Sequence, residues 1–338
     1  MWYRLAKALL FRLPTERSHH IAMQSLQWLA RLRLLPWLYP TPKANPVTVM
    51  GLSFPNRVGL AAGLDKNGDY LAGLSALGFG FIEIGTVTPK PQPGNPAPRL
   101  FRLPEQQAII NRMGFNNGGV AQLLENVTAT PIAPLLGINI GKNKLTDEAD
   151  AVQDYLYCFE QVYQYADYIT INISSPNTPG LRALQFGEPL RELLAALKDK
   201  QAACTQQYQR YVPMAVKVAP DLTESEVNSL AETFTEFNVD GVIATNTTMS
   251  REKVAGHPLA TEAGGLSGAP LRDAATEIIR QFYLALPETI PIIAVGGIMS
   301  ATDAEQKLAA GARLVQIYSG FIYRGPGLVA EVIRATAR

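Results

Sequence analysis

The stretch YITINISSPNTPG, residues 168–180, changes from an apolar run to a stiff polar loop within a few residues. The run at 168–173 predicts a buried strand. In the loop, Pro176 and Pro179 fix φ and remove N–H donors, so the loop is stiff and its Ser and Asn side chains are held in place. A loop of this kind at the C-terminal end of a strand is typical of a catalytic site. Ser and Asn caps of an ordinary strand-to-helix turn would have the same composition.

Seven further apolar runs are separated by longer, helix-like stretches. With 168–173, they lie at 58–62, 81–85, 135–140, 214–218, 241–245, 292–295 and 314–318. Eight strands that alternate with helices over about 290 residues predict an α/β fold, the (β/α)8 TIM barrel. A doubly wound sheet is the alternative, but no GxGxxG follows the first run. Just upstream, VTVMGLSFPN at 47–56 predicts a hairpin with Gly51 near its turn.

Charge is distributed unevenly along the 338 residues. The net charge of +1 gives no support to nucleic-acid binding. Residues 1–44, however, carry seven Lys and Arg side chains against the single acid Glu16, a net charge of +6 that leaves −5 for the remainder. This basic segment predicts a partner of its own, and an anionic membrane surface is one candidate.

The N-terminal segment 1–44 is predicted to be helical, and residues 45–338 are expected to form the catalytic barrel. Helices are expected over 2–13, with Leu5, Leu9 and Leu13 on one face, and from about residue 16 to about 35. Trp2, Tyr3, Trp28, Trp37 and Tyr39 favour an interfacial membrane anchor. A helical cap packed on its own domain is the alternative.

Compartment and topology follow from what the chain lacks. Cys158 and Cys204 are its only cysteines, so a reducing compartment is expected and neither a metal site nor a disulfide framework is predicted. We find no secretory signal and no run near the ~20 apolar residues that span a bilayer. The protein is therefore expected to be soluble or to lie on a membrane without crossing it. The absence of a transit or transmembrane segment predicts a peripheral location at the cytoplasmic face of a bacterial cell membrane.

The apolar runs end in polar, charged and glycine residues, which are poorly suited to a packed core and well suited to binding a ligand. In a barrel these ends converge on one face, whatever their separation in sequence. They carry Lys66, Thr86, Asn139, Lys217, Thr245, Asn246 and Thr247, and later GGLSG (264–268), VGGI (295–298) and QIYSGF (316–321).

Two of these features suggest an anionic ligand. Lys217 lies inside an apolar strand, where burial is costly without a negative partner, so we expect an anion partner or a Schiff-base nucleophile. Glycines after the sixth, seventh and eighth strands predict a phosphate-bearing ligand, because barrels bind phosphate through the backbone N–H groups of their late loops. Each glycine pair alone would also suit an ordinary turn.

Histidine is absent from every strand end, so the general base is sought among Ser175, Lys66, Lys217 and Asp65. Asp65 suits a structural cap equally well, and Asp221 is expected at a helix N-terminus. Five amides are expected on the same face, and they suit a flat heterocycle with alternating C=O and N–H groups, although some of them would only brace loops. They are Asn111, Asn139, Asn172, Asn177 and Asn246.

Ten longer motifs, spread from the first strand to the last, resemble one known family. In order they are LAAGLDKNG, EIGTVTPKPQPGNPAPRLFRL, NRMGFNN, GINIGKN, NISSPNTPGLR, VKVAPDL, GVIATNTT, GGLSG, VGGI and VQIYSGF. Together they resemble class 2, quinone-dependent dihydroorotate dehydrogenase. The resemblance implies one non-covalent FMN per chain, oxidation of (S)-dihydroorotate to orotate in de novo pyrimidine (UMP) biosynthesis, and electron transfer to a membrane quinone. It also implies a peripheral membrane enzyme, expected to be a monomer, with no nucleic-acid partner and no metal.

The same resemblance implies roles for single residues. Ser175 would be the base that takes the C5 proton while the C6 hydride passes to flavin N5; class 1 relatives carry cysteine at this place. The FMN site would comprise Ala62, Gly63, Lys66, Thr86, Asn139, Asn172, Lys217, Thr245, Gly268, Gly297, Tyr318 and Ser319. The substrate site would comprise Lys66, Asn111, Arg112, Met113, Gly114, Phe115, Asn172, Asn177, Asn246 and Thr247. A quinone tunnel would pass His19, Arg102 and Tyr318.

Three other functions stay open at this point. A class 1-type FMN dehydrogenase would use a soluble acceptor such as fumarate or NAD, but Ser175 and the basic N-terminal segment argue against it. A Schiff-base aldolase would be built on Lys217. A membrane-associated barrel that only binds a phosphorylated ligand would leave Ser175 and the convergent amides without a purpose.

Overall fold

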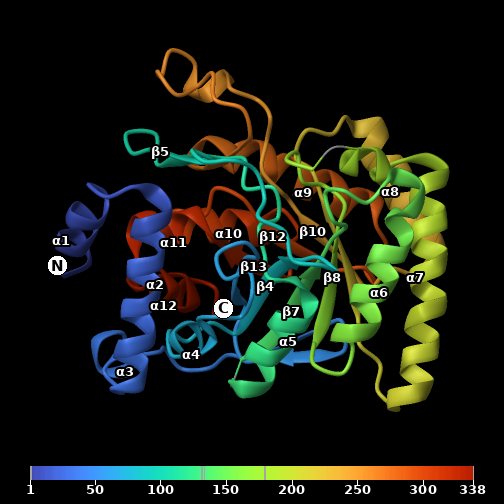
Figure 1. Ribbon diagram of the computed structural model, residues 1–338, viewed down its shortest axis with the longest axis horizontal. Helices are drawn as coiled ribbons and strands as arrows, with labels where there is room; N and C mark the ends of the chain where they lie inside the picture. The colour runs from blue at the N-terminus through green and yellow to red at the C-terminus, as the bar shows by residue number, and fades with distance from the viewer. Residues whose placement is uncertain (1, 131, 133, 179, 338) are drawn as a thin grey trace.

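A closed barrel of eight parallel strands forms the centre of the computed structural model, which describes residues 2–130, 132, 134–178 and 180–337 (Figure 1). Neighbouring strands follow chain order, and the last strand pairs with the first. All eight predicted strands are confirmed, and Pro179 of the loop after the fourth lies outside the described residues. The strands are β3 (Val58–Leu60), β4 (Phe81–Val87), β7 (Leu135–Ile140), β8 (Tyr168–Asn172), β9 (Met214–Val218), β10 (Gly241–Ala244), β12 (Ile292–Val295) and β13 (Leu314–Ile317).

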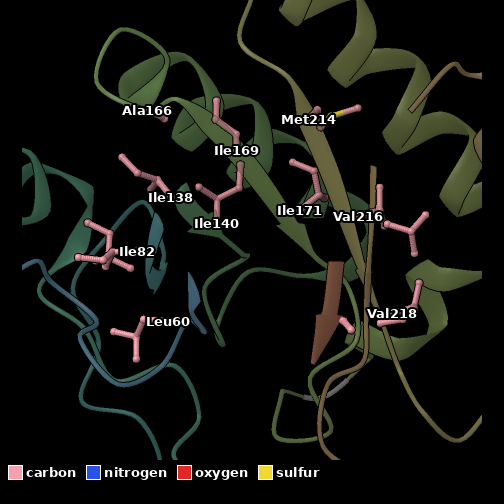
Figure 2. Close-up of a cluster of buried hydrophobic side chains, with 14 of the residues drawn as sticks. Leu60, Ile82, Ile138, Ile140, Ala166, Ile169, Ile171, Met214, Val216 and Val218 are labelled. Atoms are coloured by element: carbon pink, nitrogen blue, oxygen red, sulfur yellow. The ribbon is translucent and has the colours of Figure 1, made fainter. Parts of the chain in front are cut away.

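Helices cover the outside of the barrel because the outward-facing side chains of the strands are apolar, while polar residues such as Glu83 and Lys217 lie among the inward-facing ones. Ile82, Ile138, Ile171 and Val216 lie fully buried between strands and helices (Figure 2). The surrounding helices are α4 (Leu71–Ser75), α5 (Gly119–Ala129), α6 (Ala151–Val162), α7 (Gly187–Tyr208), α8 (Glu224–Glu236), α9 (Arg272–Ala285), α10 (Ala301–Ala309), α11 (Ser319–Arg324) and α12 (Gly327–Ala335).

The N-terminal end of the barrel is closed by aromatic packing. The predicted hairpin is confirmed as β1 (Val47–Val49) and β2 (Leu52–Phe54). Phe54 of the hairpin meets Phe81 inside the barrel, with ring centroids 5.2 Å apart. Gly59 makes room for this ring, since a Cβ there would lie 2.3 Å from Phe81. This packing leaves the opposite, C-terminal end of the barrel for a ligand.

A second sheet, which the sequence analysis missed, stands over that open end. It contains three antiparallel strands, β5 (Leu100–Leu103), β6 (Ala108–Asn111) and β11 (Gly265–Gly268). The GGLSG stretch, expected to be a loop, thus forms a strand, because its backbone pairs with β6.

Three N-terminal helices lie together at one side of the barrel (Figure 1). They are α1 (Trp2–Leu10), α2 (Thr15–Arg31) and α3 (Leu35–Leu38). The second helix ends at Arg31 rather than near residue 35, because the chain reverses at Arg33, where φ is 55°, and so buries Leu35 completely. The described part of the chain contains no helix that is both long and apolar enough to cross a membrane.

Candidate active site

A cavity of about 980 Å³, counted with its open mouth, lies at the C-terminal end of the barrel. It brings together the residues expected around cofactor and substrate, except Asn139 and Arg112. Its lining also includes Gly296 and Gly320, from the predicted glycine clusters, and Ala61, Ser267, Leu271, Val295, Ile298 and Gln316, to which the sequence analysis gave no role of their own.

The two exceptions have other partners. Asn139 is fully buried inside the barrel, where its amide nitrogen donates to Glu83 Oε1 at 2.8 Å. Arg112 points away to an ion pair with Glu262, 2.6 Å between Nη1 and Oε2.

Ser175 lies in the cavity wall and is only 5% exposed. Its Oγ accepts a hydrogen bond from the backbone N–H of Asn177 at 3.3 Å. The Asn177 side chain in turn donates to the backbone carbonyl of Asn111 at 3.2 Å, which ties the Ser175 loop to the end of β6. Thr178, three residues after Ser175, has a buried Oγ1 that no other described residue contacts by a hydrogen bond.

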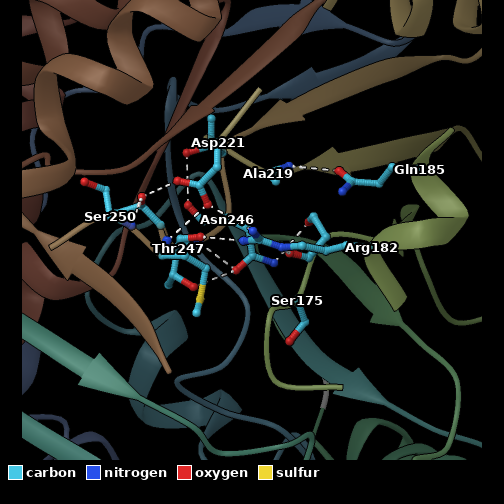
Figure 3. Close-up of polar contacts among 12 residues, drawn as sticks. Ser175, Arg182, Gln185, Ala219, Asp221, Asn246, Thr247 and Ser250 are labelled. Carbon is cyan, nitrogen blue, oxygen red and sulfur yellow. Dashed lines mark hydrogen bonds and ion pairs between the residues drawn. The ribbon is translucent and has the colours of Figure 1, made fainter. Parts of the chain in front are cut away.

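Arg182 holds the Ser175 loop against two neighbouring loops (Figure 3). Its guanidinium donates to the carbonyl oxygens of Ser174 and Thr247, both at 3.1 Å, and to Asp221 Oδ2 at 3.0 Å. The prediction that Asp221 begins a helix is therefore wrong, since Thr223 caps α8. The only sequence signal for Arg182 was its place in the NTPGLR stretch.

Lys217 lines this cavity at the barrel floor. Its Nζ lies 4.0 Å from Oε1 of Glu83, and both side chains are almost fully buried. Burial lowers the pKa of Lys217, and the negative charge of Glu83 opposes this change. Glu83 is the negative partner that the sequence analysis required but did not find, although a Glu inside the apolar run FIEIG carried the same signal as the buried lysine.

Lys66 lies at the other wall, and its Nζ donates to the Gly63 carbonyl at 3.0 Å. Burial and, to a smaller extent, Arg99 lower the pKa of Lys66 to about 8, whereas Glu16 and Asp65 oppose the change. Asp65 accepts from the backbone N–H groups of Asp69 and Tyr70 at 2.9 and 2.8 Å, so it caps the turn before α4.

The predicted phosphate site involves the loops that follow the last strands of the barrel, β12 and β13. Gly297 has φ 72°, and a Cβ there would lie 2.3 Å from Cα of Arg272. Ser319 begins α11, and its hydroxyl is 2.9 Å from that of Ser267 on β11. These glycine and serine positions enclose one end of the cavity.

A second cavity lies between the N-terminal helices and the barrel, and its wall is mainly apolar. His19, Arg102 and Tyr318 all line it, and Tyr318 lines the first cavity too. Burial lowers the pKa of His19 to about 4. Arg102 donates to the Leu13 carbonyl at 2.6 Å and stacks on Phe11, so it also fixes the α1–α2 connection.

Apolar side chains on the N-terminal helices point to solvent. Leu9 is 65% exposed and Trp37 80% exposed, whereas Met23 and Leu35 of the same segment pack in the core. The side chain of Trp2 lies outside what the structure describes. In the described part of the chain, His, Cys, Asp and Glu side chains form no group of three or more that could hold a metal ion.

Comparison with known proteins gives one consistent family. The family model for "Dihydroorotate dehydrogenase" matches residues 45–338. A protein of Chromobacterium violaceum named "Dihydroorotate dehydrogenase (quinone)" is 59% identical, with 100% of this chain and 98% of the relative covered. A protein of the same name from Marinobacter nauticus is 57% identical, with 98% of each chain covered.

A solved structure agrees with the sequence relatives. The structure of DHODH from Eimeria tenella in complex with ferulenol superposes with a TM-score of 0.85 at 36% identity, covering 94% of this chain and 90% of that one. Since the family model matches most of the chain and the relatives match nearly all of it, this chain belongs to the dihydroorotate dehydrogenase family.

Proposed function

We propose that this protein oxidises (S)-dihydroorotate to orotate in pyrimidine biosynthesis, with FMN as its cofactor and a membrane quinone as its electron acceptor. The observation that carries the proposal is the convergence of Ser175, Lys217 and the amides on one cavity that shares Tyr318 with a second, apolar cavity. The first cavity provides for the substrate reaction, and the second is open to an apolar acceptor.

The residues around the first cavity suit FMN. Polar side chains and glycine backbone from several strand ends converge on it, as in other small-molecule sites. Gln316 Oε1 is buried without a partner among the described residues and lies in this wall, where a ligand N–H group would satisfy it. Gly63 has φ 104° and lines the same cavity, so the backbone can approach a ligand there.

Residues from several strand ends would hold the cofactor, which when bound supplies the acceptor for the hydride that leaves C6 of dihydroorotate. Lys217 would supply a fixed positive charge in a dry site, where it stabilises developing negative charge better than water does. The set would comprise Ala62, Gly63, Lys66, Thr86, Asn172, Lys217, Thr245, Gly268, Gly297, Tyr318 and Ser319, with Asn139 behind Thr86 rather than at the cavity wall.

Ser175 would remove the proton from C5 of the substrate. A serine hydroxyl is a poor base by itself, so its own proton must move on to a further group. The Thr178 hydroxyl supports such a relay because it is buried, close in sequence and without a described partner. Lys66 would pair with the substrate carboxylate, while Asn111, Asn177 and Asn246 would orient the pyrimidine ring.

Residues 1–44 would form the quinone and membrane segment of a monomeric enzyme at the cytoplasmic face of a bacterial membrane. Seven basic residues and the exposed Leu9 and Trp37 support this, since basic amphipathic helices bind anionic bilayers in the interface plane. Quinone would then enter the cavity beside α1 and α2 and approach Tyr318.

An anaerobic absorbance spectrum tests the proposal. Purified protein should show bound flavin that bleaches when dihydroorotate is added. Ser175→Ala should keep FMN and substrate binding but reduce flavin about 100-fold or more slowly, the usual contribution of a positioned base.

Other spectra would lead to other conclusions. Flavin that stays oxidised would refute dihydroorotate as substrate. A flavin-free protein whose Lys217 is trapped by borohydride with a carbonyl substrate would replace the proposal with an aldolase. Near-normal reduction of Ser175→Ala would remove Ser175 from the base role.

A further inference from the structure

A continuous chain of hydrogen bonds runs from the barrel floor to the substrate face of the cavity. Asn139 donates to Glu83 Oε1 at 2.8 Å, and Thr86 donates to Asn139 Oδ1 at 2.5 Å. Asn172 then donates to Thr86 Oγ1 at 2.8 Å, and Asn246 donates to Asn172 Oδ1 at 3.3 Å. All these donors point toward Glu83. We propose that Glu83 is a positioning residue that sets the direction of these amides and thereby the pattern with which the cavity recognises the substrate ring.

This direction follows from the chemistry of a carboxylate. An amide can be turned either way, since its oxygen and nitrogen are alike in shape, but an ionised carboxylate can only accept. Asn139 must therefore turn its nitrogen to Glu83 and its oxygen to Thr86. Thr86 has one proton, which it gives to Asn139, so its oxygen is left to accept from Asn172. The carbonyl of Asn172 is then the group that meets Asn246.

The other groups around Glu83 are hydrogen-bond donors or positively charged, so the carboxylate accepts from all of them. Tyr168 OH lies 3.0 Å from Oε2, and Gln316 Nε2 lies 2.6 Å from the same atom. Gln316 also donates to the Tyr168 oxygen at 3.3 Å, so the Tyr168 proton must go to the carboxylate. The Lys217 ammonium at 4.0 Å adds a positive charge, and Glu83 itself is completely buried. A buried carboxylate surrounded by donors is the stable form of this site.

The same carboxylate accounts for the unpartnered atom of Gln316. Because its nitrogen faces Glu83, its Oε1 is left as a buried acceptor in the cavity wall. Glu83 thus acts on both sides of the site. Toward the cofactor it leaves Gln316 Oε1 as an acceptor, and toward the substrate it sets the direction of Asn139, Thr86 and Asn172. Two backbone N–H groups support the same direction, that of Ser174 at 3.4 Å from Asn172 Oδ1 and that of Thr247 at 2.8 Å from Asn246 Oδ1. This inference rests on the proposed function, because it assigns those amides to a substrate.

The substitution Glu83→Gln keeps the shape of the side chain but replaces a hydrogen-bond acceptor with a donor, so it disturbs the direction of the hydrogen-bond chain. The new NH₂ group must face a donor on one side. Opposite Asn139 it forces that amide to turn or lose its bond, and the change passes through Thr86 to Asn172; opposite Gln316 it forces Gln316 to turn or lose its bond, which changes the acceptor that Gln316 presents to the cavity. We expect orotate to bind the FMN-loaded Glu83→Gln enzyme ~10-fold or more weakly, since a buried polar group without a partner is costly. The readout is the dissociation constant of orotate, from the change in flavin absorbance during titration.

Two further variants show whether a loss of orotate affinity comes from reversed hydrogen bonds or from disturbed packing around position 83. Tyr168→Phe removes a donor to Glu83 but keeps the carboxylate, so orotate affinity should stay within about twofold of wild type. The double variant Glu83→Gln/Asn139→Asp places a carboxylate at position 139 that accepts both from the new amide at position 83 and from Thr86, so the chain from Thr86 onward regains its direction. It should recover most of the lost orotate affinity, and it is informative even where the single variant fails to fold.

The outcomes are distinct. Weak binding by Glu83→Gln with recovery in the double variant supports the proposal. Unchanged affinity in Glu83→Gln, an equal loss in Tyr168→Phe, or a double variant that binds orotate ~10-fold more weakly than wild type would each overturn it. Bleaching of the wild-type flavin by dihydroorotate reports on the proposed function separately, so it can stand when the role of Glu83 fails.

Discussion

Arg182 and Asp221 form an ion pair, 3.0 Å between Nη1 and Oδ2, that joins the loop after β8 to the loop after β9. Because the guanidinium also reaches the carbonyls of Ser174 and Thr247, one side chain connects three of the loops around the cavity. Ser174 is the neighbour of Ser175, so this arrangement determines where the proposed base lies.

Arg182→Ala should therefore slow flavin reduction by dihydroorotate ~10-fold or more while FMN stays bound, because small displacements of a reacting group cost large factors in rate. Stopped-flow absorbance measures the rate. Arg191→Ala is the matched control: Arg191 also pairs with a carboxylate, that of Glu236, but on the exposed surface, where such pairs contribute little. Equal effects of the two substitutions would contradict a positioning role for Arg182.

Gly297→Ala should weaken FMN binding. Position 297 has φ 72°, where a Cβ costs about 1–2 kcal/mol, and the added atom would meet the backbone of Arg272. We expect the dissociation constant of FMN to rise ~10-fold or more, measured by the recovery of flavin fluorescence on dilution. Gly327→Ala has open space around its Cβ and should bind FMN as the wild type does. Normal FMN retention by Gly297→Ala would remove this loop from the phosphate site.

Orotate affinity should fall as the pH rises through about 8, the pKa of Lys66, because the lysine then loses the charge that would pair with the carboxylate. Titrations of flavin absorbance on both sides of this pKa would show the fall, and Lys66→Arg, which stays charged, should flatten the curve. The stability of the fold should change in the opposite direction. Between pH 8 and 10.5, Lys66 is deprotonated in the folded protein but still protonated in the unfolded chain. The free energy of unfolding that this group contributes therefore rises with pH over this range. An unchanged pH curve in Lys66→Arg would refute the pairing.

Leu9→Ser and Trp37→Ser should each weaken binding to anionic phospholipid vesicles about tenfold or more, as expected for removing an apolar side chain from a membrane interface. Cosedimentation measures the binding, and flavin reduction by dihydroorotate should not change. Leu284→Ser is the control, because Leu284 is 78% exposed on α9, outside the N-terminal segment. Equal losses in all three variants would show that the N-terminal helices are not the membrane surface.

Several features were predictable from the sequence because their causes are local. Strands buried on both faces require continuous apolar runs, so all eight barrel strands could be located from residues near them in the chain. The hairpin that carries Phe54 was equally visible, since Gly51 suits a turn with positive φ. The strand-end residues converge because parallel strands end on one face, and this rule needs no knowledge of side-chain contacts.

The tertiary structure decided which distant residues meet. The strand β11 was not predictable because GGLSG has little strand character, and its pairing with β6 exists only when the barrel brings the two segments together. Likewise, Lys217 by itself required a negative partner, but Glu83 lies on another strand. Arg182, Asp221 and Thr247 come from three separate loops. Local propensity and hydrophobic pattern act within a few residues and determine the elements, whereas hydrogen bonds and ion pairs depend on distances that the closed barrel alone establishes.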